Sequence, residues 1–385
     1  MSSFAPDEYA RRVAAARARM VEKDLSALLI FAQESHYYLF GYDGGGYVFF
    51  QCAILPADGA PVTLLCRRPD VAQAQDTSGI DDIRVWYDAH GANPAVDLRA
   101  IVEEKGLGGG RIGIEVDNYG LTGANYVRVR DALEGVGDLV DASDLVRALR
   151  IVKSAAEVAL IRTAAALADD AVDAVFEQAR PGVVDSVLAA ASLSAMLAGG
   201  GDVPPAGPLV NSGSRALYGR GVGGARDLQA EDQIMIELAA SYRRYNCCIE
   251  RFIVLGTPSR EQRKMHALVE ETLSTMLAAF TPGEPLGRVD EVHRRMLDAA
   301  GYADQRYAAC GYSLGATYRP SWMDVPPMIY AGNPLEVRPG MVFFPHVMLG
   351  DRDKGLAMGL GNTVLITDKG AESLTRLPLN LMTKH

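Results

Sequence analysis

Apolar positions in the N-terminal part of the chain follow two spacings, one typical of helices and one of strands. Residues 7–22 repeat Ala, Val and Met at helical intervals between charged side chains, which predicts an amphipathic helix. Residues 96–105 follow the same pattern. Short apolar runs between turn-forming residues predict strands, and these runs lie at 25–32, 47–55, 61–66, 80–86 and 111–116. Helices and strands that alternate in this way predict a mixed α/β domain.

The pattern changes near residue 150. Ser154 and Glu157 have the spacing of a capping box, in which each side chain bonds the backbone N–H of the other residue. A strongly helix-forming stretch follows over 157–175, so a long helix is predicted to begin here. We therefore divide the chain into a domain of residues 1–148 and a domain of residues 149–385.

The second domain combines long helices with apolar strands. Helices are predicted over 260–280 and 287–300, and Pro or Gly follows each of them. Strands are predicted at 233–239, 247–255, 341–349 and 362–367. Two helical layers and strands of antiparallel character predict an α+β domain.

Composition narrows the class of protein. The 385 residues are 49% hydrophobic and 22% charged, the balance of a globular protein. The net charge of −10 argues against a nucleic-acid partner, and no apolar run approaches the roughly 20 residues that span a bilayer. The N-terminal residues lack the apolar core of a secretory signal. Five cysteines, of which Cys247 and Cys248 are adjacent, form no disulfide framework, so a reducing cytoplasm is the expected location.

Five stretches of the second domain match the sequence motifs of one known superfamily, and they occur in the same order. They are L-R-I-V-K-S-A-A-E-V (149–158), E-D-Q-I-M-I-E-L-A-A-S-Y-R-R-Y-N-C-C-I-E-R (231–251), C-G-Y-S-L-G (310–315), R-P-G-M-V-F-F-P-H (338–346) and L-G-N-T-V-L-I-T-D-K-G-A-E-S-L-T (360–375). Together they resemble the creatinase, prolidase and methionine-aminopeptidase superfamily. The resemblance implies a C-terminal pita-bread catalytic domain, preceded by a smaller mixed α/β domain of the creatinase type.

The resemblance also identifies the positions of the family's metal ligands. The metallopeptidases bind two divalent ions through Asp, Asp, His, Glu and Glu. The matching positions here are Glu237, Cys248, Tyr312, His346 and Gly361, and none keeps its expected residue. Bridging carboxylates are what a two-metal site needs, so we expect no metal or other cofactor. One zinc held by Glu237, Cys248 and His346 is the alternative.

Metal-free members of the superfamily share further motifs with this chain. Creatinase hydrolyses a C–N bond without metal, and ectoine hydrolases open a small cyclic amidine. The residues around Glu250 and Arg251 resemble the A-L-E-R-T of creatinase. G-Y-S-L-G…P-x-W-x-D at 311–324 resembles the ectoine hydrolase version, including the tyrosine in place of histidine. Arg220 stands where creatinase has its catalytic histidine, so the creatinase reaction itself is not expected.

Five residues are candidates for catalysis. Glu250 is expected to bind and protonate a cationic nitrogen, although an ion pair on a strand edge is the simpler reading. Glu237 lies in an apolar strand, where a carboxylate must find a partner or stay protonated. Cys248 is either a packed thiol or a nucleophile with His346 as its base. Tyr312 and His346 occupy family active-site positions and are expected to contact the substrate.

Six residues are candidates for substrate binding. Trp322 and Asp324 share a loop with Tyr312. Its aromatic rings are expected either to pack as a lid or to cradle a cation, and the carboxylate of Asp324 is expected to bind a substrate amine. Arg220 and Arg319 are candidate clamps for a substrate carboxylate, or ordinary surface arginines. By resemblance to the two-domain branch, Tyr42 and Tyr47 are expected to reach the active site of a second subunit, which predicts a homodimer. The remaining histidines are expected at surface, helix-face or tail positions and are His36, His90, His266, His293 and His385.

These observations predict a metal-independent hydrolase acting on a C–N bond of a small polar molecule. The first alternative is a metal-dependent Xaa-Pro dipeptidase or aminopeptidase, which the fold alone favours. A metal-free lyase and a non-catalytic binding protein of the same fold are further alternatives, because fold does not fix function. No nucleic-acid or membrane partner is expected.

Overall fold

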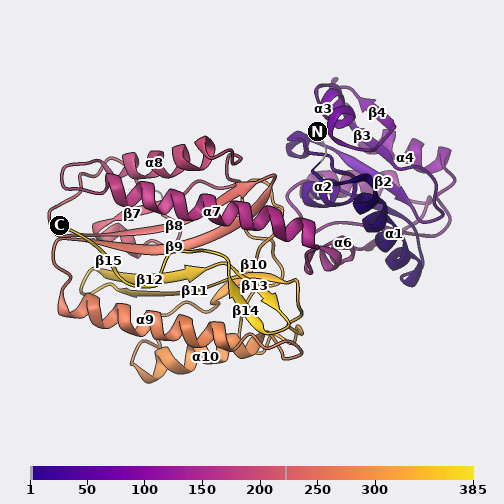
Figure 1. The fold of residues 1–385 in the computed structure, drawn as a ribbon. Coiled ribbons are helices and arrows are strands. Elements are labelled where there is room, and N and C mark those ends of the chain that lie inside the picture. The colour runs from indigo at the N-terminus through magenta and orange to yellow at the C-terminus, as the bar shows by residue number, and fades with distance from the viewer. Residues whose placement is uncertain (1–2, 222) are drawn as a thin grey trace. The chain divides into compact units, whose positions relative to one another are not determined.

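The computed structural model describes residues 3–221 and 223–385. The chain separates into two compact units, Met1–Arg150 and Ile151–His385, which Figure 1 shows as indigo to purple and as magenta to yellow ribbons. Among the described residues, no helix combines the length and the apolar character that a membrane span requires.

The first unit is built on a six-stranded mixed sheet in the order β4-β3-β2-β1-β5-β6. Its strands are β1 (Leu25–Ile30), β2 (Cys52–Pro56), β3 (Thr63–Arg67), β4 (Asp82–Trp86), β5 (Arg111–Ile114) and β6 (Asp138–Asp141). Its helices are α1 (Pro6–Glu22), α2 (Gln33–Phe40), α3 (Val71–Thr77), α4 (Pro94–Glu104), α5 (Gly123–Ala132) and α6 (Ser143–Arg150), with short 3-10 turns η1 (Gly46–Val48) and η2 (Arg68–Asp70). The predicted mixed α/β architecture is confirmed.

Strand β1 is buried on both faces of this sheet. Ala27 and Leu29 pack into one hydrophobic cluster, and Leu28 and Ile30 pack into another. Side chains alternate across a strand, so a strand covered on both faces reads as an unbroken apolar run. This explains why the stretch after α1 showed no polar alternation.

One predicted strand of the first unit is wrong over part of its length. Residues 47–51 form the turn η1 and irregular backbone, and β2 begins only at Cys52. The side chains of Gln51 and Asp70 pack directly against the α-carbon of Gly46, where a Cβ would overlap them. This position therefore requires a glycine. The aromatic residues after it have high strand propensity, but they lie outside the strand.

The second unit is a nine-stranded sheet between two helical layers (Figure 1). The main strand order is β14-β13-β11-β12-β9-β8-β7, with β10 on β11 and β15 on β9. The strands are β7 (Leu209–Ser212), β8 (Asp232–Tyr242), β9 (Tyr245–Leu255), β10 (Gly311–Ser313), β11 (Val342–Asp351), β12 (Leu356–Asn362), β13 (Val364–Thr367), β14 (Gly370–Ser373) and β15 (Met382–Lys384). The helices are α7 (Ala155–Gln178), α8 (Asp185–Ala198), α9 (Arg260–Ala278) and α10 (Gly287–Ala299), with the 3-10 turn η3 (Gly213–Leu217).

Helices α7 and α9 pack on opposite faces of this sheet. Helix α7 contacts β8 and β9, whereas α9 contacts β11 and β12. The predicted capping box at the start of α7 is present, because Ser154 and Glu157 each bond the other residue's backbone N–H. The pairs within the sheet are antiparallel except for β15 on β9. The predicted α+β class of this unit is confirmed.

Strands β8 and β9 form a hairpin with a two-residue turn. Tyr242 pairs with Tyr245, and the turn residues Arg243 and Arg244 have φ values of 47° and 67°. Positive φ at both central positions is the geometry whose twist matches that of the flanking strands. Such a short turn fixes the register of the whole ladder, and the register decides which side chains meet at the functional site.

Candidate functional site

Two carboxylates face each other on neighbouring strands. Glu237 of β8 pairs directly with Glu250 of β9, so their side chains lie on the same face of the sheet. Glu250 is 2% exposed, and its Oε2 atom has no hydrogen-bond partner among the described residues. Glu237 is half-buried and is the member of the pair closer to solvent. We call these two residues the carboxylate pair.

Tyr312 of β10 connects the carboxylate pair to two other predicted residues. Its hydroxyl donates a hydrogen bond to Oε1 of Glu237 at 3.2 Å and accepts one from Nε1 of Trp322 at 2.8 Å. The same hydroxyl lies 3.6 Å from Sγ of Cys248. Cys248 precedes Glu250 by two positions on β9, so both face the site.

His346 of β11 also lies beside the pair. Its Nδ1 lies 3.7 Å from Oε2 of Glu250, which is too long for a hydrogen bond. The imidazole stacks on Phe344, with 5.4 Å between ring centroids and 17° between planes. Gly361 of β12 pairs in the ladder with both His346 and Glu250. Because this glycine has no side chain, the two functional groups meet across the strand that separates them.

Burial shifts the pKa values of these groups strongly. It raises the pKa of Glu237 to about 7, although the hydrogen bond from Tyr312 and the charge of Arg220 oppose the rise. Burial, followed by the charge of Glu237, raises the pKa of Glu250 well above the range of a glutamate. Burial lowers the pKa of His346 to about 4, and the charge of His293 adds to this. The protonated form of Glu250 is therefore favoured, Glu237 exchanges its proton near neutral pH, and His346 is a neutral imidazole there.

Arg251 has a structural role on the opposite side of β9. Its guanidinium donates to the backbone carbonyls of Glu250, Gly361 and Leu377 and to Oδ1 of Asn362, all at 2.8–2.9 Å. Burial lowers the pKa of Arg251 to about 10, so it is a cation at neutral pH. These bonds tie β9 to β12 and hold the backbone on which Glu250 stands.

The structure argues against Cys248 as a nucleophile with His346 as its base. Cys248 is fully buried, and the Tyr312 hydroxyl is the one side-chain hydrogen-bonding neighbour of its Sγ among the described residues. Burial, followed by the negative charge of Glu237, raises the pKa of the Cys248 thiol well above its usual range. A thiolate is therefore disfavoured here, and the packed-thiol alternative fits the contacts.

The predicted binding residues of the second unit lie at different distances from the carboxylate pair. Trp322 is buried and joined to the pair through Tyr312. Asp324 is also buried, and its carboxylate lies against Gly315. Arg220 is exposed, but its charge lowers the pKa of Glu237, so it lies within electrostatic reach. Arg319 is exposed, and its predicted role as a clamp stays a prediction.

Tyr42 is buried within its own unit, so its burial does not favour the predicted contact with another subunit, which stays a prediction. Tyr42 is 0% exposed and packs in the core of the first unit. Its hydroxyl donates to Oε1 of Gln51 at 3.0 Å, and its carbonyl accepts from Gln33. Tyr47 lies in η1 and is partly exposed, so its predicted role stays a prediction.

Sequence reasoning missed several residues around the site. Phe344 stacks on His346 and tilts against Tyr312. It precedes His346 by two positions on the same strand, so strand alternation could have predicted that both side chains face the site. Tyr307 lies close enough for the charges of the carboxylate pair to raise its pKa, after burial. His36 lies on helix α2, where it is fully buried, and its Nε2 lies 2.9 Å from the carbonyl oxygen of Ile30. His266 and His293 occupy buried helix faces.

The residues at the family's metal-ligand positions do not fit a two-metal centre. Gly361 offers no ligand atom, and a Cβ added there would overlap the ring of Phe344. Tyr312 is already hydrogen-bonded to Glu237 and Trp322. The alternative of one zinc on Glu237, Cys248 and His346 does not fit either. Across the described residues, their ligand atoms do not all lie within 4.8 Å of one another.

Comparisons with known proteins agree with this architecture. The sequence model of the creatinase/prolidase N-terminal domain matches residues 12–152, and that of metallopeptidase family M24 matches residues 159–368. The ectoine hydrolase of Halomonas elongata is 26% identical over 397 aligned positions, covering 99% of this chain and 98% of that protein. The Xaa-Pro dipeptidase of Pyrococcus furiosus is 28% identical over 273 positions, covering 69% and 76%.

Solved structures show the same fold over the full length. The prolidase from Thermococcus sibiricus superposes with a TM-score of 0.87 at 22% identity, covering 97% of this chain and 99% of that one. The X-Pro aminopeptidase from Thermotoga maritima superposes with a TM-score of 0.84 at 21% identity and full coverage of both chains. The M24 match spans more than half of the chain, which therefore belongs to metallopeptidase family M24 and is a hydrolase of C–N bonds built on the pita-bread fold.

Proposed function

We propose that this protein is a metal-independent hydrolase acting on a C–N bond of a small polar molecule with an amidine-type nitrogen. The carboxylate pair carries the proposal. Glu250 is a buried acid that holds its proton at neutral pH, and Glu237 opposite it has a pKa of about 7. Two titratable groups whose surroundings set different protonation states are the usual basis for assigning an acid and a base.

The chemistry needs no external proton donor. Glu237, as a carboxylate, takes a proton from water while the water oxygen bonds to the carbon of the C–N bond. The C–N bond breaks, and Glu250 gives its proton to the leaving nitrogen. Glu237 then holds a proton and Glu250 is an anion. Because the two side chains face each other, a proton passes from Glu237 back to Glu250 and restores the starting state.

The surrounding residues position and polarise the substrate. Tyr312 donates to Glu237 and thereby keeps its carboxylate form accessible near neutral pH. His346 is half-buried and neutral, so it offers a ring nitrogen that accepts a proton or a hydrogen bond from the substrate. Trp322 fixes the orientation of Tyr312. Arg220, near Glu237, is the candidate partner of a substrate carboxylate.

The similarity to an ectoine hydrolase suggests the first substrates to test. That relative matches nearly the whole of both chains, and ectoine is a cyclic amidine with a carboxylate. An amidinium group is complementary to an acidic pair, and a carboxylate is complementary to Arg220. Ectoine, other cyclic amidines and creatine-like guanidines therefore form the first panel.

A prolidase-type metallopeptidase is the second candidate, because Xaa-Pro dipeptidases are also among the relatives. The decisive experiment assays the amidine panel and Xaa-Pro dipeptides with and without a chelator that removes divalent metal. We expect chelator-resistant hydrolysis of an amidine. Dipeptide cleavage that is lost on chelation and restored by added Mn²⁺ or Co²⁺ would establish the metallopeptidase instead.

Glu250→Gln serves as the mechanistic variant in this assay. The amide keeps the size of the side chain but cannot give a proton, so kcat is expected to fall about 10²- to 10⁴-fold. Glu231→Gln is the matched control, because Glu231 is exposed and immediately precedes β8. Wild-type activity in Glu250→Gln would overturn the assignment of the acid.

We further propose that the protein acts as a cytoplasmic homodimer. All five cysteines are free, which suits a reducing compartment. Next to Tyr47, Val48 is 65% and Phe49 is 49% exposed, an apolar tip that a second copy would cover. Light scattering should give twice the chain mass, and Tyr47→Ala should raise KM. A monomer with full activity would contradict both expectations.

A further inference from the structure

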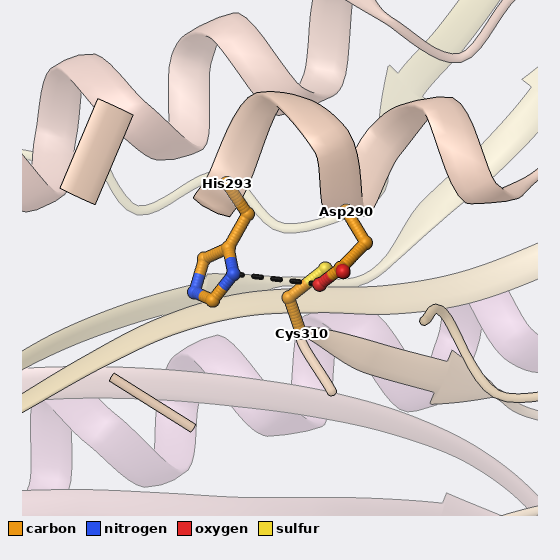
Figure 2. Close-up of side chains that lie close together, drawn as sticks. All are labelled: Asp290, His293 and Cys310. Atoms are coloured by element: carbon orange, nitrogen blue, oxygen red, sulfur yellow. Dashed lines mark ion pairs between the residues drawn. The ribbon is translucent and has the colours of Figure 1, made fainter. Parts of the chain in front are cut away.

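Three buried side chains with metal-binding chemistry converge beside the functional site. Asp290 and His293 lie on α10, and Cys310 immediately precedes β10 (Figure 2). Asp290 is 0% exposed, and His293 and Cys310 are each 1% exposed. One ligand atom from each residue lies within 4.8 Å of the other two. We call these residues the α10–β10 cluster.

Three buried polar atoms of this cluster lack hydrogen-bond partners among the described residues. Neither carboxylate oxygen of Asp290 nor Nδ1 of His293 has one among the described residues. Cys310 belongs to a hydrophobic core cluster of the second unit that also contains Val289 and Ile329, and Asp290 and His293 are buried beside it. A carboxylate in apolar surroundings is strongly unfavourable unless it is paired or coordinates a cation. Unpartnered buried polar atoms on Asp290 and His293, beside the thiol of Cys310, therefore point to an ion between the three side chains.

The geometry suits a tetrahedral ion. Nδ1 of His293 and Oδ1 of Asp290 are 3.4 Å apart, longer than an ordinary N–H···O hydrogen bond. Two ligands at about 2.0–2.2 Å from a tetrahedral zinc are roughly 3.3–3.5 Å from each other. Positions three apart on a helix share one face, so α10 presents both ligands together.

The ligand chemistry selects the class of metal. A thiolate, an imidazole and a carboxylate form a soft-to-borderline set, which suits Zn²⁺ and its relatives and disfavours Mg²⁺ and Ca²⁺. As metal ligands, one carboxylate, one thiolate and one imidazole together carry two negative charges, which one divalent ion neutralises. Figure 2 shows the three side chains directed toward one another from a helix and a loop.

We propose that Asp290, His293 and Cys310 bind one zinc-class divalent ion, with water as a fourth ligand, in a site separate from the carboxylate pair. The ion fastens α10 to the chain entering β10. The carbonyl of Cys310 accepts from the backbone N–H of His346 at 3.0 Å, so the site lies next to the strand that carries His346. One bound ion per chain is then compatible with a metal-independent reaction.

Cobalt substitution tests this site directly. The purified protein is stripped with a chelator and titrated with Co²⁺, while elemental analysis and absorption spectra are recorded. We expect one ion per chain and a thiolate-to-cobalt charge-transfer band. Cys310→Ala should abolish the band, and Asp290→Asn should weaken Co²⁺ binding at least 10-fold. Cys66→Ala, which removes a buried cysteine of the first unit, should leave both unchanged.

The outcomes separate this site from the carboxylate pair. Cys248→Ala should retain the band, since Cys248 is not in the cluster. Loss of the band in that variant, or its persistence in Cys310→Ala, would place the ion elsewhere and overturn the proposal. Failure of the wild-type protein to bind Co²⁺ or Zn²⁺ would also overturn it, even if Cys310→Ala does not fold. The spectra do not depend on catalysis, so inactivity toward amidines leaves this test intact.

Discussion

Nδ1 of His346 lies 3.7 Å from Oε2 of Glu250, and Gly361 occupies the strand between them. The pair is a contact of neutral groups at neutral pH, because burial raises the pKa of Glu250 and lowers that of His346. A side chain at position 361 would fill the gap that brings them together. The glycine in the middle of β12 is thus part of the site, although it has no functional group.

Gly361→Ala should damage both stability and activity. The added Cβ would overlap the ring of Phe344 and approach Cβ of His346 to 2.9 Å. Overpacking of this kind destabilises by about 1–3 kcal/mol, and displacement of His346 should lower kcat about 10-fold or more. Urea unfolding and kinetics measure the two effects. Gly207→Ala is the control, since nothing lies within 4 Å of a Cβ at that glycine, and it should behave as wild type.

Glu237→Gln should stabilise the protein at alkaline pH. The folded pKa of about 7 exceeds the ordinary value of 4.5, so the folded state holds the proton more tightly than the unfolded chain. Ionising Glu237 therefore reduces stability as pH rises from 4.5 through 7, by as much as about 3 kcal/mol. The variant removes this loss. Its free energy of unfolding should exceed that of wild type at pH 8 and match it at about pH 4, below the unfolded pKa. An equal difference at both pH values would show that ionisation is not the cause.

Tyr312→Phe should shift the pH dependence of the reaction. Wild-type kcat/KM is expected to rise with pH through a midpoint near 7 as Glu237 becomes a carboxylate. The hydrogen bond from Tyr312 lowers the pKa of Glu237, so its removal raises that pKa and moves the midpoint to higher pH. A lower plateau with an unmoved midpoint would instead indicate that Tyr312 only shapes the site. Trp322→Phe, which leaves the tyrosine in place, should produce a smaller shift.

Cys248→Ala should retain activity within about 10-fold of wild type. The thiol is buried, holds its proton and has no base beside it, so it takes no covalent part in the reaction. Steady-state kinetics of the variant measure this. Removing a true nucleophile costs several orders of magnitude in kcat. A loss of that size with an intact fold would restore the nucleophile hypothesis.

Much of the fold could be predicted from local sequence. Ser154 and Glu157 mark the start of α7 through their own hydrogen bonds, and the long helices and most core strands have clear periodicity. Strand β12 escaped prediction because Gly359 and Gly361 lower its strand propensity, yet it lies between β9 and β11. Its glycines make room for Glu250 and Phe344, a requirement set by other strands.

The sequence by itself determined the family, the two architectures and the positions of Glu237, Glu250, Tyr312 and His346. Motif order and spacing are local properties of a chain, and the hairpin register follows from them. Only the tertiary structure decided which groups are charged, since pKa values depend on burial and on neighbours from other strands. The tertiary structure also surrounds Cys248 with groups that keep it an inert thiol. It buries Tyr42 in the core of the first unit. It also joined Cys310 to Asp290 and His293 across a loop that carries no motif.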